Sequence, residues 1–336
     1  MAKVKSIVVG TGGMSRFHIR SMLSMSGSTA IVGFVEPAEA SREAIRQIFL
    51  EENKTCPPFS GTIKQLIADQ GAPDAAMICS PHKYHLENAS DCLKAGMHVC
   101  LEKPMVMNTS EAQRLIRLRD KTGRILVVAF PGSLSPAIEK AKSLISKGAL
   151  GNVSVISAFV HQRWKQFTTG AWRQIPEISG GGFLFDTGSH MVNTVVDLLG
   201  EDVARVTALI DNRGAPVEIN SAVSAISRSG IMLSLTGAGE SIQCVSQVTV
   251  FGDKAVLQTG VWGEFLYLKK AKDTEFVAVP FRKTRGPWEQ FLAVIAGKKE
   301  NPCPAEVGLR FARLMDMIRK SAETGQTVTA PRNSKK

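Results

Sequence analysis

The stretch VVGTGGMSRFH, residues 8–18, sets the fold of the N-terminal part of the chain. Gly10, Gly12 and Ser15 occupy the positions of a GxGxxG/A motif, directly after an apolar run and at the expected start of a helix. Glycines there let backbone N–H groups approach a pyrophosphate at the helix N-terminus. Ser15 departs from glycine, but it is small enough for close packing. The motif therefore indicates a dinucleotide-binding site.

An acidic residue follows at the distance that such a site requires. Glu36 ends the next apolar run, 21 residues after Ser15, and fits the position that binds the adenosine ribose. A carboxylate there repels a 2'-phosphate, so the sequence favours NAD over NADP. Arg42 lies close behind Glu36 and leaves NADP as an alternative.

The hydrophobic pattern changes along the chain and predicts two domains. Over residues 1–130, short apolar runs alternate with helical patterns such as 41–50, 82–95 and 110–122, which is typical of a doubly wound parallel sheet with crossover helices. Later, long β-rich stretches are interrupted by a helix over 185–199 and followed by helices near 288–295 and 305–324. We therefore predict an α/β dinucleotide-binding domain over 1–130 and an α+β domain with an antiparallel or mixed sheet over 131–330.

Composition excludes several classes of protein. The 336 residues include 41 Lys+Arg and 30 Asp+Glu, but the resulting net charge of +11 is scattered and the only terminal basic cluster is NSKK. Because few aromatic residues are available for base stacking, we expect no nucleic-acid partner. No apolar run is long enough to span a membrane and no leader pattern is seen, so we expect a cytoplasmic protein without membrane contact. The 6 cysteines show no CxxC pair or ligand spacing, so no metal site is expected.

A charged residue stands where a buried strand ends. In HVCLEKPMVMN, residues 98–108, Lys103 follows an apolar run and Glu102, and precedes Pro104. Ligands of doubly wound sheets bind at the carboxyl ends of the strands. Lys103 is thus expected in the cofactor crevice, where its ammonium could stabilise charge on a reacting oxygen. A solvated lysine beside a helix start is the alternative.

A second group of polar residues lies on the helix expected from about Asp186. Asp186, His190, Asn193 and Asp197 are spaced by four, three and four residues and form one stripe on an otherwise apolar helix. We interpret the stripe as the lining of a cleft, with Asp186 fixing the tautomer of His190 and His190 accepting a hydroxyl proton. A buried structural histidine is the alternative.

Several motifs together resemble the glucose-fructose oxidoreductase, inositol dehydrogenase and MocA (Gfo/Idh/MocA) family. They are GTGGMSRFH, SPHKYHLENASDCLKAGMHVCLEKP, GALGNV, AWRQIPEISGGGFLFDTGSHMVNTVVDLLG and KSAETGQTV. The resemblance implies a Rossmann domain followed by an α+β domain with a large open sheet, through which a homodimer or homotetramer forms. It also implies a nicotinamide cofactor and a sugar, inositol or related polyol as substrate.

The resemblance also implies roles for individual residues. Lys103, Asp186 and His190 become the catalytic set. The residues implied to line the cofactor are Gly10, Thr11, Gly12, Gly13, Met14, Glu36, Ser80, Pro81, His85, Glu102, Lys103, Trp172 and Arg173. The chain departs from the family at Pro131, Gly132 and Ser133, where many members have Asn and Arg, and at Asn193, where Asp is common. These departures leave the identity of the substrate open.

The predicted function is NAD-dependent hydride transfer between nicotinamide and a secondary alcohol or ketone of a sugar, sugar acid or inositol-like substrate. His161, Arg163, Trp164, Lys165 and Asn193 are the candidate substrate contacts. One alternative is glycoside cleavage by transient oxidation and elimination with the same cofactor. The other is a non-catalytic NAD-binding sensor on the same fold.

Overall fold

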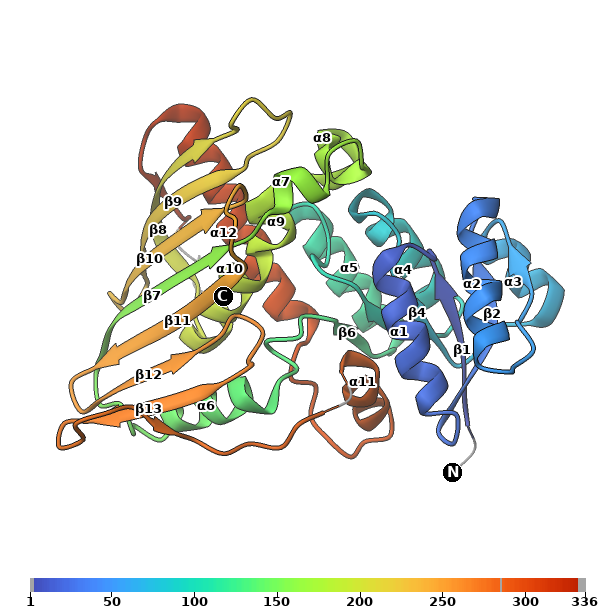
Figure 1. The fold of residues 1–336 in the computed structure, drawn as a ribbon, viewed down its shortest axis with the longest axis horizontal. Coiled ribbons are helices and arrows are strands. Elements are labelled where there is room, and N and C mark those ends of the chain that lie inside the picture. The colour runs from blue at the N-terminus through green and yellow to red at the C-terminus, as the bar shows by residue number, and fades with distance from the viewer. Residues whose placement is uncertain (1–2, 285, 332–336) are drawn as a thin grey trace. The chain divides into compact units, whose positions relative to one another are not determined.

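The computed structural model describes residues 3–284 and 286–331, which form two compact units (Figure 1). Unit 1 comprises the chain up to Val106, Ser110–Ala129, and a returning segment that ends at Ala305. Unit 2 comprises Met107–Thr109, Phe130–Thr284 and the chain from Glu306. The NSKK cluster lies outside the described residues. No helix in the described ranges is long and apolar enough to cross a membrane.

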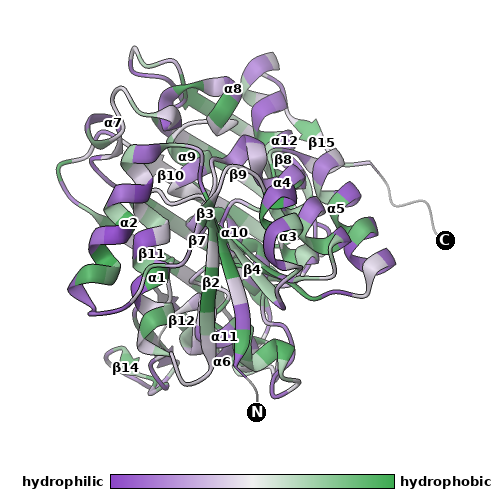
Figure 2. Cartoon of the chain, turned by 90° about the vertical axis from the view of Figure 1, so that its right-hand side faces the viewer, coloured by the Kyte–Doolittle hydropathy of each residue, from purple (hydrophilic) through white to green (hydrophobic). Residues whose placement is uncertain are grey.

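Unit 1 is built on a six-stranded parallel sheet with the order β3-β2-β1-β4-β5-β6. Its elements are β1 (Val4–Val9), α1 (Gly13–Ser24), β2 (Thr29–Val35), α2 (Glu39–Glu51), β3 (Phe59–Ser60), α3 (Ile63–Gln70), β4 (Ala75–Ile78), a 3₁₀ turn (His82–Tyr84), α4 (His85–Lys94), β5 (His98–Leu101), α5 (Thr109–Thr122), β6 (Leu126–Val128) and α11 (Pro287–Ile295). Figure 2 shows the hydrophobic course of β2 and the hydrophilic residues of α2. Because helices cover both faces of the sheet, its strands are nearly continuous apolar runs.

Unit 2 is built on a nine-stranded mixed sheet with the order β14-β13-β12-β11-β7-β10-β9-β8-β15. Its elements are α6 (Pro136–Ser146), β7 (Val153–His161), α7 (Trp164–Phe167), a 3₁₀ turn (Trp172–Gln174), α8 (Pro176–Ser179), α9 (Phe183–Asp186), α10 (Gly188–Leu199), β8 (Val203–Asp211), β9 (Asn220–Ser227), β10 (Met232–Ala238), β11 (Val245–Gly252), β12 (Ala255–Thr259), β13 (Leu266–Lys270), β14 (Val277–Ala278), α12 (Ala305–Thr324) and β15 (Val328–Thr329). Within this sheet, as far as the structure describes it, strands β7 and β10 pair in parallel and the other strand pairs are antiparallel. Helices α6, α9 and α10 pack on one face of this sheet.

The predicted fold class is confirmed, with corrections to its boundaries. The predicted helix over 185–199 is two helices, α9 and α10, joined at Thr187. The predicted second domain was continuous from 131 to 330, but the segment carrying α11 belongs to unit 1. Its hydrogen bonds explain why: the side-chain amide of Asn301 donates to the carbonyl of Leu126, and the Val128 N–H donates to the carbonyl of Cys303. This segment thereby covers the edge of strand β6, whose polar groups would otherwise be exposed.

Glycine is required at the end of β1. Gly10 has a positive φ of 81°, and a Cβ there would lie 2.7 Å from the backbone nitrogen of Ser80. The backbone after β4 therefore passes too close to Gly10 for any side chain at this position. Backbone atoms cannot move aside as the end of a flexible side chain could. This close approach brings the loop after β1 and the loop after β4 together at one edge of the sheet.

We expect Gly10→Ala to lower the free energy of unfolding by about 1–3 kcal/mol, because it combines left-handed strain with a backbone clash. The measurement is urea denaturation of the isolated protein. Gly13→Ala is the matched control, since a Cβ on Gly13 meets no atom within 4 Å. Equal stability of the two variants would contradict the requirement for glycine at position 10.

Candidate functional site

The glycine-rich turn leads from β1 into the N-terminus of α1 and leaves open space in front of it. A Cβ on Gly12 or Gly13 would meet no atom within 4 Å, and Met14 is 44% exposed. The N–H groups of the first helical turn have no partners within the helix, and together with the helix dipole they attract anions. The turn thus fits a dinucleotide pyrophosphate.

Glu36 lies just after β2 and is held by backbone and side-chain donors. Its Oε2 accepts hydrogen bonds from the N–H and the hydroxyl of Thr11, at 2.9 and 3.0 Å, and its Oε1 accepts from the N–H of Ala38 at 2.9 Å. Arg42 donates to the carbonyl oxygen of Glu36. A carboxylate oxygen accepts more than one hydrogen bond, so Glu36 keeps capacity for a ribose hydroxyl while its orientation is already fixed.

Glu102 follows β5 and forms a buried pair with a residue that the sequence reasoning missed. The Nε2 of His18, on α1, lies 2.6 Å from the Oε1 of Glu102. Burial raises the pKa of the Glu102 carboxyl, but the hydrogen bond with His18 and the charges of His18 and Lys103 outweigh it and lower the pKa to about 2. Glu102 is therefore ionised at neutral pH, and its Oε2 accepts the N–H of Lys103 at 2.9 Å.

The chain around Lys103 is also tied to the loop that follows β4. The ring nitrogens of His85 lie 2.8 Å from the carbonyl oxygen of Pro104 and 2.9 Å from that of Ser80. Burial lowers the pKa of His85 and outweighs the hydrogen bonds to Pro104 and Ser80, which raise it. Pro81 lies between Ser80 and the 3₁₀ turn. His85 is fully buried, so in this structure it joins two loops rather than facing solvent.

In unit 2, Asp186 ends α9 and is buried with two donors. Its Oδ2 accepts hydrogen bonds from the indole N–H of Trp164, at 2.8 Å, and from the Nε of Arg173, at 2.9 Å. The guanidinium of Arg173 also stacks 4.5 Å from the ring centroid of Trp172. Trp164, predicted as a substrate contact, is only 3% exposed, so here it serves as a partner of Asp186.

The polar stripe on α10 is buried, contrary to the predicted lining of a cleft along its whole length. His190 packs between the rings of Phe130 and Trp262, with ring centroids 6.1 and 5.6 Å away. Further along the stripe, the amide of Asn193 donates to the hydroxyl of Ser133, and Asp197 pairs with Lys142 on α6. The last two residues of the stripe therefore bind the segment 133–142 rather than line an open surface.

Two polar residues that the sequence did not single out hold the glycine loop before α9. Arg319, on α12, donates to the carbonyl oxygens of Gly180 and Met107 and stacks on Phe185 at 4.4 Å. Glu218 accepts the N–H of Phe185, and burial raises the pKa of its carboxyl. A Cβ on Gly182 would lie 2.0 Å from the carbonyl oxygen of Glu218. The glycines are needed so that the loop can pack here.

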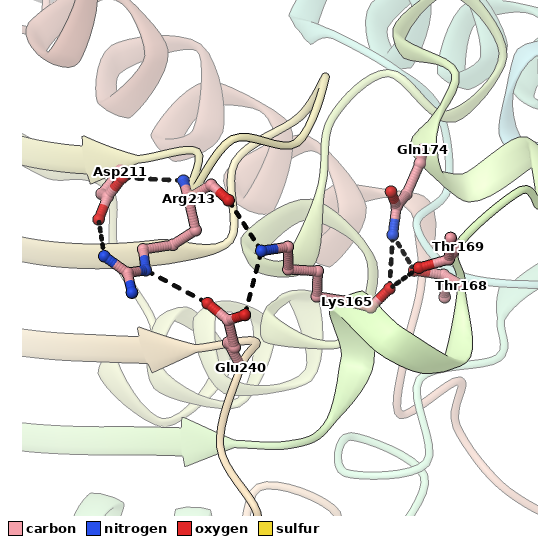
Figure 3. Close-up of polar contacts among 7 residues, drawn as sticks. All are labelled: Lys165, Thr168, Thr169, Gln174, Asp211, Arg213 and Glu240. Atoms are coloured by element: carbon pink, nitrogen blue, oxygen red, sulfur yellow. Dashed lines mark hydrogen bonds and ion pairs between the residues drawn. The ribbon is translucent and has the colours of Figure 1, made fainter.

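Lys165, a candidate substrate contact on α7, is joined to neighbouring loops (Figure 3). The Lys165 ammonium donates to the carbonyl oxygen of Arg213 and to Glu240, which also pairs with the guanidinium of Arg213. Lys165 is thus compensated by an acid and is poorly suited to bind an anionic substrate. His161, at the end of β7, is partly exposed, and Arg163, just before α7, is exposed.

The predicted site residues are divided between the units. Those from the loops after β1, β2, β4 and β5, including Lys103, belong to unit 1, whereas Asp186, His190 and the candidate substrate contacts belong to unit 2. Within the described ranges, no group of three or more His, Cys, Asp or Glu side chains is placed to hold a metal ion.

Comparison with known proteins connects both units to one family. Residues 4–130 match the model of an oxidoreductase family with an NAD-binding Rossmann fold, GFO/IDH/MocA, and residues 138–258 match the C-terminal domain of the same family. The two matches together cover more than half of the chain.

Individual relatives are distant but extend over most of the chain. Oxidoreductase P35 of Formosa agariphila is 26% identical over 73% of this chain and 78% of its own length. D-glucoside 3-dehydrogenase of Escherichia coli is 27% identical over 76% of this chain and 79% of its own length. The structure of the WlbA dehydrogenase from Bordetella pertussis, in complex with NADH and UDP-GlcNAcA, has a TM-score of 0.82 at 22% identity and covers 99% of this chain and 100% of that one. This structural likeness supports the fold.

Proposed function

Because the chain belongs to the GFO/IDH/MocA oxidoreductase family, we propose that it transfers a hydride between NAD and a secondary alcohol or ketone of a sugar, sugar acid or inositol-like substrate. The observation that carries the proposal is the placement of Lys103 directly after β5, with its N–H held by the ionised carboxylate of Glu102. The name of the Escherichia coli relative, a D-glucoside 3-dehydrogenase, supports a sugar-like substrate.

The catalytic roles that we propose follow from the chemistry of the side chains. When bound, the nicotinamide supplies the hydride acceptor for oxidation of the alcohol carbon. The Lys103 ammonium donates a hydrogen bond to the reacting hydroxyl oxygen and stabilises the negative charge that develops there. His190 accepts the hydroxyl proton as the C–H hydride departs, leaving a ketone. Asp186, held by Trp164 and Arg173, orients His190 and stabilises its protonated form.

The function is tested by following product and reduced cofactor together in a screen of sugars, sugar acids and inositols. A dehydrogenase forms one ketone for each NADH and stops when free NAD is exhausted. Many turnovers on substoichiometric NAD, with cleavage of a glycoside and solvent deuterium beside the oxidised carbon, would instead show transient oxidation. NAD binding with no turnover of any compound would favour a sensor.

On a confirmed substrate, we expect Lys103→Met and His190→Gln each to lower kcat by roughly a hundredfold or more, the usual scale for one acid/base or electrostatic group. NADH affinity, measured by fluorescence titration, should change little. Lys83→Met, on the 3₁₀ turn after β4, is the control. Full turnover by the Lys103 variant would exclude the proposed role of this lysine.

The preference for NAD rests on Glu36. Its carboxylate is fixed by Thr11 and Ala38 and is close enough to Thr11 to face the cofactor turn. We expect NAD to bind at least about tenfold more tightly than NADP. Glu36→Ser should reduce the difference between the binding free energies of the two cofactors by about 1–3 kcal/mol. Isothermal titration with both cofactors measures this, and Glu43→Ser, an exposed acid of α2, is the control. Tighter binding of NADP by the unaltered protein would refute the assignment.

We also propose that the uncovered face of the nine-stranded sheet joins copies of this chain. On the face opposite the helices, the outward positions of β7, β9, β10, β11 and β12 carry no charged residue. Met232 and Phe251, on either side of the outward-facing Val155, are 56% and 40% exposed. A solvated face of an antiparallel sheet is ordinarily polar, and large uncharged patches mark interaction sites.

A dimer or tetramer is therefore expected in light scattering coupled to gel filtration. Phe251→Glu, which introduces a charge into this face, should shift the protein to a monomer while leaving its circular dichroism unchanged. Leu50→Glu alters a residue of α2 that is 68% exposed and should leave the assembly intact. A monomeric unaltered protein would contradict this proposal.

A further inference from the structure

His18 connects the helix of the dinucleotide turn to the end of β5. It lies in the second turn of α1, only 1% exposed, and faces Glu102, which is 84 residues away in the sequence and 7% exposed. The 2.6 Å distance between Nε2 and the carboxylate is typical of a charge-assisted hydrogen bond. The pair therefore connects α1, whose N-terminus would bind the cofactor, with the end of β5, which is followed by the proposed catalytic residue Lys103.

Among the residues that the structure describes, only Glu102 makes a polar contact with the His18 ring. Its Nδ1 is buried and finds no hydrogen-bond partner among the described residues. Because an ionised carboxylate only accepts hydrogen bonds, Nε2 must carry the proton. The N–H of Nε2 is therefore directed at the Glu102 carboxylate.

The carboxylate in turn holds the backbone of Lys103. One oxygen of Glu102 faces His18 and the other accepts the N–H of Lys103, while the N–H of Glu102 itself donates to the carbonyl of Ile78 in β4. The Glu102 side chain is thus fixed at both oxygens and at its backbone. Rotation of the carboxylate away from His18 would release the N–H of Lys103.

We propose that His18 is a positioning residue that holds Glu102 so that Lys103 leaves the end of β5 in its reactive orientation. This inference rests on the proposed role of Lys103. It assigns to α1 a second task besides anion binding, because the same helix that begins at the dinucleotide turn supplies the donor that orders the lysine segment.

The inference predicts a distinctive change in the titration of Glu102. The titratable and charged groups that act on its carboxyl are His18 from α1, His85 from α4, Cys79 after β4, Cys100 in β5 and the adjoining Lys103. Without His18, burial remains and the strongest stabilising partner is lost, so the pKa of Glu102 rises. The carboxyl then protonates at a higher pH, and its protonated form no longer orders Lys103 in the same way.

The experiment compares His18→Leu, His18→Gln and the control His98→Gln. His98 lies at the opposite end of the same strand, β5, where its Nδ1 accepts the N–H of Ile125. In protein carrying ¹³C-labelled glutamate, the Glu102 carboxyl signal is assigned by its absence from Glu102→Gln and titrated without any cofactor. The pH profile of kcat and the fluorescence titration of NADH are then measured on each variant.

We expect His18→Leu to raise the pKa of Glu102 and to lower kcat roughly tenfold to a hundredfold. The acid limb of the kcat profile should move to higher pH by as much as the pKa of Glu102 rises. His18→Gln should recover most of this loss, because its amide donates to the carboxylate, and His98→Gln should match the unaltered protein.

An unchanged Glu102 titration in His18→Leu would overturn the inference. So would full kcat in His18→Leu together with lost kcat in Lys103→Met, whereas full kcat in Lys103→Met would instead overturn the proposed function. Should His18→Leu not fold, a His18→Gln variant with a kcat as low as that of Glu102→Gln but an unchanged Glu102 titration would also count against it.

Discussion

No side chain fits between the ends of strands β1 and β4, and the geometry of the cofactor edge depends on this constraint. At Gly10 the backbone turns with a positive φ, and a Cβ there would lie 2.7 Å from the backbone nitrogen of Ser80, which begins the next loop. The turn places the N-terminus of α1 at the carboxyl edge of the sheet. Since the strands are parallel, the loops after β2, β4 and β5 end at the same edge and bring Glu36, Ser80 and Lys103 to it.

Three carboxylates of the predicted site are each held by hydrogen-bond donors from their own unit. Thr11 and Ala38 hold Glu36, His18 and the N–H of Lys103 hold Glu102, and Trp164 and Arg173 hold Asp186. A buried carboxylate without donors would protonate or displace the chain around it. With them, each charge keeps a fixed direction before any ligand arrives, and such preorganisation is what electrostatic catalysis and specific binding require.

The sequence predicted the positions of those site residues that follow directly after an apolar run. Gly10, Glu36 and Lys103 each stand at the end of an apolar run, so their edge of the sheet followed from the alternation of strands and helices, and the fold class and family are confirmed. The pairing of His18 with Glu102 could not be predicted, because it depends on how α1 packs over strands far away in the sequence. The same holds for α11, whose amphipathic pattern does not say which sheet it covers, and for the donors of Asp186, which come from two short segments without a regular period.

The two departures from the family pattern acquire a physical meaning in unit 2. Ser133 and Asn193 are hydrogen-bonded to each other and fully buried, one turn of α10 beyond His190. An aspartate at position 193 would bring a negative charge into this contact and would need a positive partner such as an arginine. Serine and asparagine are both uncharged, so neither needs an ion-pair partner at this position. This buried contact is therefore made without a charge, which would itself need a charged or hydrogen-bonding partner.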